Sequence, residues 1–228
     1  ASRSRVDSSG AISVGGFSKS DDKAPDFWSL FCYIVYTMKK QVVVIAGPSG
    51  SGETTFTEEL MLAYPHFTRA VSATTRPPRA DERDGEDYYF ITKDRFLEEA
   101  RAGNIPEHTY VPNRDAYYGA YLPDLRKKLE SGKTVIVNTD LGGAMFFKQN
   151  YGATTIFLKP KSVQLLHRLI HREPNMSKDE LIARLINATQ EMLEAEQNYD
   201  HVVFTGKGDF ADTILKIIDY LRKDGYGI

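Results

Sequence analysis

Residues 42–55 read VVVIAGPSGSGETT, and this stretch decides the fold. It begins with a continuous apolar and mostly β-branched run, which is typical of a strand buried on both faces of a parallel sheet. The residues that follow have the spacing G-x-x-x-x-G-K-[ST] except at one position, and a helix-like segment comes after them. A strand, a glycine-rich loop and a helix in this order predict a loop that binds phosphate groups.

The chemistry of such a loop depends on its backbone. Glycines let the chain wrap closely around phosphates, and the positive end of the following helix favours an anion. The alternative, a glycine-rich turn without a nucleotide role, is disfavoured by the strand before it and the helix after it. We expect nucleotide phosphates to contact Gly47, Pro48, Ser49, Gly50, Ser51, Gly52, Thr54 and Thr55, with the Thr54 hydroxyl as the ligand of Mg²⁺.

Position 53 departs from the motif. Glu53 stands where the motif has a lysine whose ammonium group reaches the β- and γ-phosphates. Unit charges about 4 Å apart interact by about 4 kcal/mol at an effective dielectric near 20, so exchanging attraction for repulsion costs several kcal/mol. A rate loss of about a thousandfold or more follows from that energy. An inactivating substitution, a sequence error and a natural pseudoenzyme are all compatible with this residue.

The rest of the chain alternates strand-like and helix-like segments. Short β-branched runs at 134–137, 154–158 and 201–204 predict further buried strands. Ser177 to Glu180 form a capping box at the start of a helical pattern, and residues 209–221 form another. This alternation predicts an α/β fold with a mostly parallel sheet flanked by helices.

Composition limits the class of protein. The chain has 228 residues, with 29 basic and 31 acidic side chains, which argues against a strongly basic protein devoted to nucleic acid. Its one cysteine, Cys32, excludes an intramolecular disulfide framework and fits a reducing compartment. The apolar run at 27–38 is shorter than the roughly 20 residues of a membrane span and lacks a basic flank, so we expect no membrane partner and a cytoplasmic location.

The first residues differ from the rest in composition. Residues 1–26 are rich in Ser and Gly and have almost no large apolar side chains, which favours a flexible N-terminal extension over 1–37. Met38 is then a candidate start of the folded part, which we expect at 38–228. The alternative is a regulatory arm whose aromatic stretch, residues 27–36, docks elsewhere.

A second group of chemically informative residues lies at 72–90, which read SATTRPPRADERDGEDYYF. Two arginines three residues apart, with a serine before them and a tyrosine after them, can surround a phosphate monoester, because guanidinium groups pair bidentately with phosphate oxygens. A solvated loop is the alternative for arginines beside prolines.

With these motifs the sequence resembles the guanylate kinases from about Lys40 to the C-terminus. The resemblance rests on the phosphate loop, on S-x-T-T-R-x-x-R-x-x-E-x-x-G-x-D-Y-x-F at 72–90 and on the Tyr-Tyr-Gly at 117–119. It implies a P-loop core, a GMP-binding subdomain at about 72–130 and a helical lid at about 166–186. It also implies the reaction of ATP and GMP, as small-molecule substrates, to ADP and GDP with Mg²⁺.

The resemblance also implies roles for single residues. Ser72, Arg76, Arg79, Tyr88 and Tyr118 match the groups that hold the GMP phosphate. Glu107 matches the carboxylate that binds the adjacent N1–H and N2–H donors of guanine, and Asp140 matches a carboxylate near the metal and GMP. Arg168, Arg172 and Arg184 match lid arginines that neutralise charge on the transferred phosphoryl group.

The departures from the family pattern lie close to this chemistry. Besides Glu53, they are Asn138, Gly142, Ala120, His108, Glu173, Pro174 and Thr205, together with a two-residue insertion between Glu107 and Tyr117. The expected GMP pocket is mostly intact, while the ATP side is altered. Two other functions therefore stay open: an inactive module that binds GMP or acidic and phosphorylated peptides, and a kinase for another phosphorylated small molecule.

Overall fold

A computed structural model describes residues 40–48, 50–161, 170, 177–206 and 210–228. The expected extension at 1–37, residues 166–169 and 171–176 of the expected lid, and the candidate residues Ser49, Arg168 and Arg172 lie outside the described residues.

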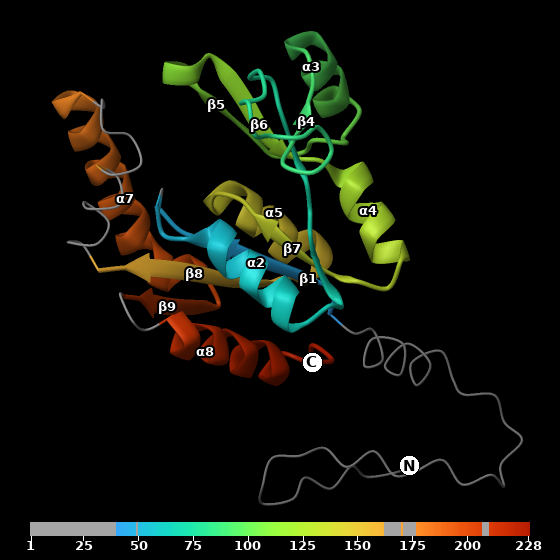
Figure 1. The fold of residues 1–228 in the computed structure, drawn as a ribbon, viewed down its shortest axis with the longest axis vertical. Coiled ribbons are helices and arrows are strands. Elements are labelled where there is room, and N and C mark those ends of the chain that lie inside the picture. Colours follow the sequence, from blue (N-terminus) through green and yellow to red (C-terminus); the bar gives the residue numbers. More distant parts are fainter. Residues whose placement is uncertain (1–39, 49, 162–169, 171–176, 207–209) are drawn as a thin grey trace, which may run out of the picture. The chain divides into compact units, whose positions relative to one another are not determined.

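The main sheet has five strands in the order β2-β7-β1-β8-β9, and every neighbouring pair is parallel (Figure 1). The bounds are β1 Val42–Ala46, β2 Phe67–Arg69, β7 Thr134–Asn138, β8 Thr154–Pro160 and β9 His201–Thr205. All five residues of β1 are buried, as expected for the middle strand of a parallel sheet covered on both faces.

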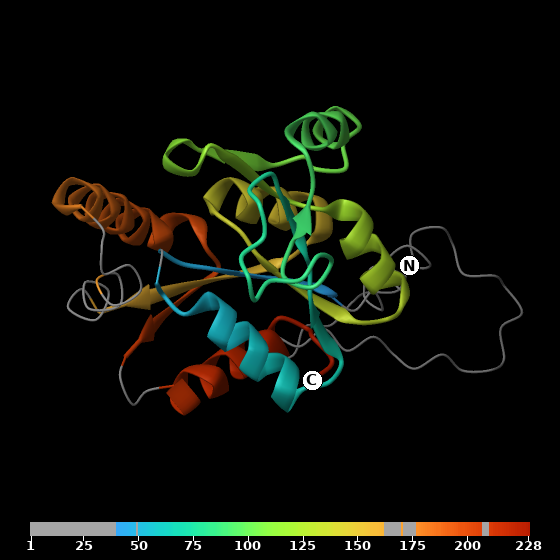
Figure 2. The ribbon, with the colours of Figure 1, turned by 45° about the horizontal axis from the view of Figure 1, so that its top comes forward.

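Helices cover both faces of this sheet (Figure 2). On one face, apolar residues of α2 (Glu53–Ala63) and α8 (Phe210–Lys223) pack with Val43 and Ile45. On the other face, α4 (Leu122–Glu130), α5 (Leu141–Tyr151) and α7 (Lys178–Asn198) pack with Val42 and Val44. The alternation of side chains along β1 therefore builds two separate cores.

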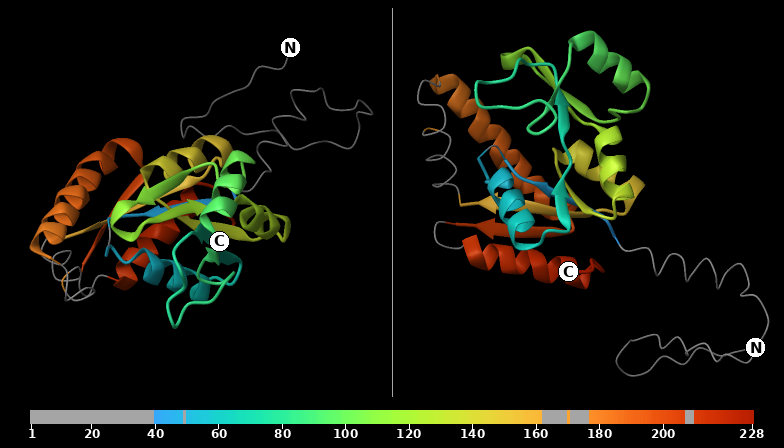
Figure 3. Two further views of the ribbon diagram at one scale, coloured as in Figure 1. Left: turned by 90° about the horizontal axis from the view of Figure 1, so that it is seen from above. Right: turned by 45° about the vertical axis from the view of Figure 1, so that its right-hand side comes forward.

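A smaller sheet of four strands lies on the α4 and α5 side, in the order β4-β3-β6-β5 (Figure 3). Its elements are β3 Ser72–Thr74, β4 Tyr89–Phe90, β5 His108–Val111 and β6 Ala116–Ala120, with α3 at Lys93–Arg101 and a 3₁₀ turn at Pro112–Arg114. It has its own small core of Ala73, Phe96 and Ile105. Strands β3 and β4 are parallel, whereas β6 runs antiparallel to both β3 and β5.

A buried carboxylate joins the small sheet to α4. Asp124 accepts hydrogen bonds from the Val71 amide at 2.8 Å, the Tyr89 hydroxyl at 3.1 Å and the Lys128 ammonium at 2.6 Å. Burial, followed by the Asp124 charge, raises the pKa of Tyr89 to about 12. These bonds connect the segment after β2, strand β4 and α4 at one point.

The structure confirms the predicted α/β fold with its parallel sheet flanked by helices. The four β-branched runs form β1, β7, β8 and β9, and the two helical patterns form α7 and α8. Ser177 caps α7 by accepting from the Glu180 amide at 3.2 Å, as predicted. Among the described residues, no helix is both long and apolar enough to cross a membrane.

Candidate functional site

The phosphate-loop motif follows the carboxyl end of β1, the middle strand of the main sheet. In open parallel sheets, ligands bind outside these strand ends, where the order of the strands changes direction. Gly50 and Gly52 have φ values of 90° and 100°, a left-handed conformation that side chains rarely adopt. Gly52 is also the N-cap of α2, so the loop leads directly into the positive end of that helix.

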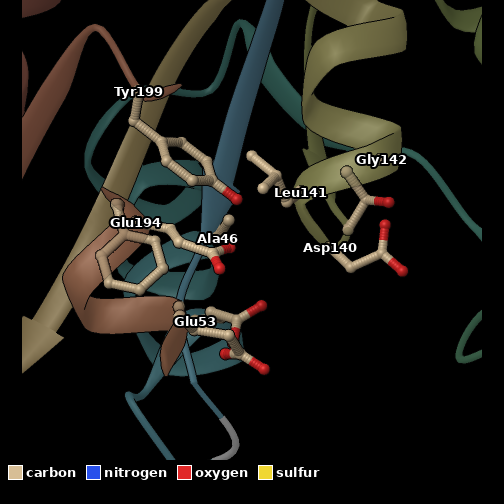
Figure 4. Close-up of a pocket in the computed structure, with 11 residues that line it drawn as sticks. Ala46, Glu53, Asp140, Leu141, Gly142, Glu194 and Tyr199 are labelled. Atoms are coloured by element: carbon tan, nitrogen blue, oxygen red, sulfur yellow. The ribbon is translucent and has the colours of Figure 1, made fainter. Parts of the chain in front are cut away.

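A cavity of about 380 Å³ opens at this point, and we call it the strand-end cavity. Its walls come from β1, the start of α2, the β7–α5 turn, β8 and the C-terminal part of α7. The lining residues are Ala46, Gly47, Glu53, Thr139, Asp140, Leu141, Gly142, Phe157, Glu191, Glu194 and Tyr199. Figure 4 shows the side chains of Glu53, Glu194, Asp140 and Tyr199 around this space.

The strand-end cavity is strongly acidic. Glu53, Asp140, Glu191 and Glu194 contribute four carboxylates, and none of the described lining residues is a lysine or an arginine. Glu191 belongs to an exposed part of α7 and lines the cavity, where partial desolvation, with the charges of Asp140 and Glu194, raises its pKa to about 7. Burial is also the main cause of the raised pKa of Tyr199, to which the charges of Asp140, Glu191 and Glu53 add.

Glu53 itself lies at the first position of α2 and lines this cavity. Its carboxylate accepts a hydrogen bond from the Ser51 hydroxyl at 3.2 Å, inside the loop. The charge that breaks the motif is therefore directed to the cavity where a phosphate-binding lysine is expected. A carboxylate near the N-terminus of a helix is favourable for the helix, but it opposes an incoming phosphate.

A second cavity, of about 230 Å³, lies between the small sheet and the end of β7, and we call it the small-sheet cavity. It brings together five of the seven residues predicted to hold GMP: Ser72, Tyr88, Glu107, Tyr118 and Asp140. Its other lining residues are His108, Thr109, Val111, Gly119, Ala120, Asn138 and Thr139. Thr139 and Asp140 line both cavities, so the two spaces share a wall.

Arg76 is held beside the small-sheet cavity by a partner that sequence reasoning missed. Its two Nη atoms donate to the two carboxylate oxygens of Glu82, each at 2.6 Å. The same carboxylate accepts from the Arg79 amide at 2.8 Å. The hydrogen bonds with Arg76 lower the pKa of Glu82 to about 2 and raise the pKa of Arg76. The glutamate three residues after Arg79 in the motif is the sequence feature that could have predicted this ion pair.

Two aromatic rings flank the guanidinium of Arg76. The guanidinium lies 5.1 Å from the ring centre of Tyr88 and 5.4 Å from that of Phe90, within the range of cation–π contacts. Arg76 Nε and the Tyr118 hydroxyl are both buried and make no well-aligned hydrogen bond with the described residues, although Tyr118 lies near enough to Arg76 to add to the raised pKa of the guanidinium. Buried donors of this kind are costly unless a ligand satisfies them.

Asp140 lies in the wall between the cavities, as the N-cap of α5. Its Oδ1 accepts from the Gly143 amide at 3.0 Å, and its Oδ2 accepts from the Thr109 hydroxyl at 2.6 Å. Gly142 lies between two carboxylates, because a Cβ placed there comes within 3.5 Å of both Asp140 Oδ1 and Glu107 Oε2.

The side chain of Asn138, another departure from the family pattern, forms hydrogen bonds with β1 and α2. Its amide nitrogen donates to the Ile45 carbonyl at 3.1 Å, and its side chain is 3.2 Å from the Thr57 hydroxyl. These contacts tie the ends of β7 and β1 to α2.

Several predicted residues line neither cavity. Arg79 has a half-exposed side chain, 3.7 Å from Glu82, and Arg184 pairs at 2.7 Å with Glu180 on its own helix. The other described members of this group are Arg76, which lies beside the small-sheet cavity, and Pro48, Gly50, Ser51, Gly52, Thr54 and Thr55. In the described part of the chain no cluster of three or more His, Cys, Asp or Glu side chains is arranged to hold a metal ion.

Comparisons with known proteins agree with this geometry. The sequence profile of the family described as "Guanylate kinase" matches residues 39–224. The guanylate kinase of Synechocystis sp. is 36% identical over 169 residues, which cover 73% of this chain and 86% of the relative. That of Thermotoga maritima is 30% identical over 188 residues, which cover 82% of this chain and 88% of the relative.

A solved structure shares the fold. The crystal structure of guanylate kinase from Anaplasma phagocytophilum superimposes with a TM-score of 0.62 at 26% identity, over 82% of this chain and 87% of that one. The profile spans both sheets and both cavities described above. The chain therefore belongs to the guanylate kinase family.

Proposed function

We propose that this chain is an ATP:GMP phosphotransferase in which ATP occupies the strand-end cavity and GMP the small-sheet cavity. The observation that carries the assignment is the shared wall of Thr139 and Asp140 at the carboxyl ends of the parallel strands. The two cavities adjoin at these residues, so a ligand in one can meet a ligand in the other end to end. Phosphoryl transfer between two nucleotides needs this arrangement.

In this proposal the small-sheet cavity recognises both ends of GMP. Glu107 accepts from N1–H and N2–H of guanine, a donor pair that adenine does not have, so AMP leaves the carboxylate without partners. Arg76, Arg79, Tyr88, Tyr118 and Ser72 surround the phosphate. The buried Tyr118 hydroxyl and Arg76 Nε support this role, since a phosphate supplies the well-aligned acceptors that they lack.

The oxygen ligands available near the loop fit Mg²⁺. Mg²⁺ prefers oxygen ligands and usually binds through one or two protein groups plus nucleotide phosphates. Such a site does not need a cluster of three or more protein ligands, and the described residues contain none. We propose the Thr54 hydroxyl as its protein ligand. When bound with ATP, the ion supplies charge neutralisation at the transferred phosphoryl group.

The chain's own residues then do little covalent chemistry. The loop amides and the positive end of α2 orient the phosphates of ATP, while Glu107 and the arginines align the GMP phosphate for in-line attack. We place the GMP-binding subdomain at about 72–130, the lid with Arg168, Arg172 and Arg184 at about 166–186, and an N-terminal extension at 1–37.

Glu53 lowers the activity in this proposal, because it adds a negative charge where the γ-phosphate of ATP must sit. ADP formation, measured in a coupled assay with GMP or AMP as the acceptor, tests the function. We expect slow turnover that depends on GMP in this chain, and faster turnover with the same acceptor preference in Glu53→Lys. No GMP-dependent ADP in either protein rejects the kinase assignment.

The acidic strand-end cavity also favours one other function, a module that uses only the small-sheet cavity. The Arg76, Arg79 and Tyr88 group can hold a phosphorylated or acidic peptide as well as a nucleotide phosphate. Titration calorimetry with GMP, ATP and a phosphoserine peptide separates the two. A binding module takes up the peptide and remains inactive after Glu53→Lys, whereas the kinase binds GMP more tightly than the peptide.

A further inference from the structure

A side-chain hydrogen bond crosses the shared wall from the small sheet to the main body. Thr109 lies on β5, and its hydroxyl donates to Asp140 Oδ2 at 2.6 Å. The other carboxylate oxygen, Oδ1, accepts from the Gly143 amide at 3.0 Å inside the α5 cap. Each oxygen of Asp140 therefore has a partner from a different element, and together the two bonds determine the direction of the carboxylate plane.

The position of Thr109 makes packing a poor explanation for this residue. Thr109 and its neighbours His108 and Tyr110 are exposed, so the side chain is not part of a core. The Thr109 backbone pairs with Tyr118 of β6, and its side-chain hydroxyl reaches across to Asp140. Glu107 lies two residues earlier in the chain, immediately before β5 begins. Both residues line the small-sheet cavity.

The hydrogen bond consequently couples two parts of the GMP site. One end is Asp140, which belongs to the main body and lines both cavities. The other end is the strand that follows Glu107, which belongs to the small sheet. The buried Asp124 attaches the small sheet at the α4 side, and the Thr109–Asp140 bond is an attachment at the cavity itself.

We propose that Thr109 is a positioning residue for GMP: its hydroxyl orients Asp140 and keeps the Glu107 segment against the main body. This inference rests on the proposed placement of GMP in the small-sheet cavity. Thr109 acts through Asp140 and not by its own contact with the substrate. Removing the hydroxyl lets the Asp140 carboxylate turn toward water. GMP binding must then realign the carboxylate, which weakens the affinity for GMP.

Titration calorimetry with GMP on the full chain tests this, using Thr109→Val, Thr109→Ser, Asp140→Ala and the double variant Thr109→Val/Asp140→Ala. One hydrogen bond at an exposed site corresponds to a loss of about three- to tenfold, so we expect Thr109→Val to raise the Kd of GMP by this factor. Thr109→Ser keeps the hydroxyl and restores binding. In the Asp140→Ala background, Thr109→Val has no further effect.

A matched control is Thr189→Val on α7, whose hydroxyl donates to the Leu185 carbonyl and which does not line the small-sheet cavity. It leaves the Kd of GMP unchanged. An unchanged Kd in Thr109→Val, or an equal loss with and without Asp140, overturns the inference while the GMP site stands. If the unaltered chain does not bind GMP, the proposed function fails and the inference falls with it. Near-UV circular dichroism verifies that each variant is folded.

Discussion

The charge at position 53 allows the most decisive perturbation of this protein. Glu53→Lys replaces a carboxylate at the start of α2 with an ammonium group in a cavity that already contains the carboxylates of Asp140, Glu191 and Glu194. At a separation of about 4 Å and an effective dielectric near 20, a unit charge at position 53 and a unit charge on the phosphate interact by about 4 kcal/mol. The reversal therefore moves several kcal/mol in favour of bound ATP.

This energy corresponds to a rise in kcat/KM for ATP of about a thousandfold or more. Glu53→Gln removes the repulsion without adding attraction, so we expect its rise in kcat/KM for ATP, on a logarithmic scale, to be about half that of Glu53→Lys. The assay is ADP formation at saturating GMP, with ATP varied. The Kd of GMP serves as the control, because Glu53 does not line the small-sheet cavity, and it stays within about twofold.

Two results would refute this reasoning. If Glu53→Lys and Glu53→Gln give equal rates, the charge at this position does not interact with the transferred phosphoryl group. If Glu53→Lys raises kcat/KM for ATP by less than about tenfold, the loop does not hold the phosphates in the proposed way.

Three further predictions concern other carboxylates. Glu107→Gln should lower the preference for GMP over AMP by at least about a hundredfold in kcat/KM, because its amide cannot accept both guanine donors; an unchanged preference contradicts the guanine role. Glu82→Gln should raise the Kd of GMP by about tenfold, since Arg76 loses its charged partner; equal affinity by calorimetry argues against a positioning role. The pKa of Glu191 is raised to about 7 in the folded protein, so folding takes up a proton between about pH 4.5 and 7, and stability declines as pH rises through that window. Glu191→Gln should therefore have the same melting temperature as the parent near pH 4.5 and a higher one at pH 7.5, and equal curves at both pH values exclude the raised pKa.

The main sheet was predictable because its strands carry their own signal. Each of β1, β7, β8 and β9 contains a β-branched run, and β1, β7 and β8 are buried along almost their whole length, whereas the edge strand β9 is partly exposed. The strands of the small sheet carry a weaker signal. β3, β4 and β5 are two to four residues long, and several of their side chains are polar or aromatic and partly exposed. Their pairing depends on contacts with distant segments, so sequence periodicity does not identify them.

The candidate site divides in the same way. Motifs and the family resemblance named seven residues for GMP, of which Arg76 and Arg79 do not line the small-sheet cavity and the other five do: Ser72, Tyr88, Glu107, Tyr118 and Asp140. They did not predict the acidic lining that α7 adds to the strand-end cavity. Glu191 and Glu194 belong to a helix far along the chain from the loop, and their direction depends on how α7 packs on the sheet.

The sequence by itself determined the parallel sheet, the turn after β1 and the inverted charge at Glu53, because these depend on local periodicity, glycine conformation and residue identity. Only the tertiary structure decided that Asp140 stands between two cavities, with Thr109 from the small sheet on one of its oxygens. A hydrogen bond between residues 31 positions apart leaves no pattern in the chain, since its geometry arises only after two separately built sheets are packed together.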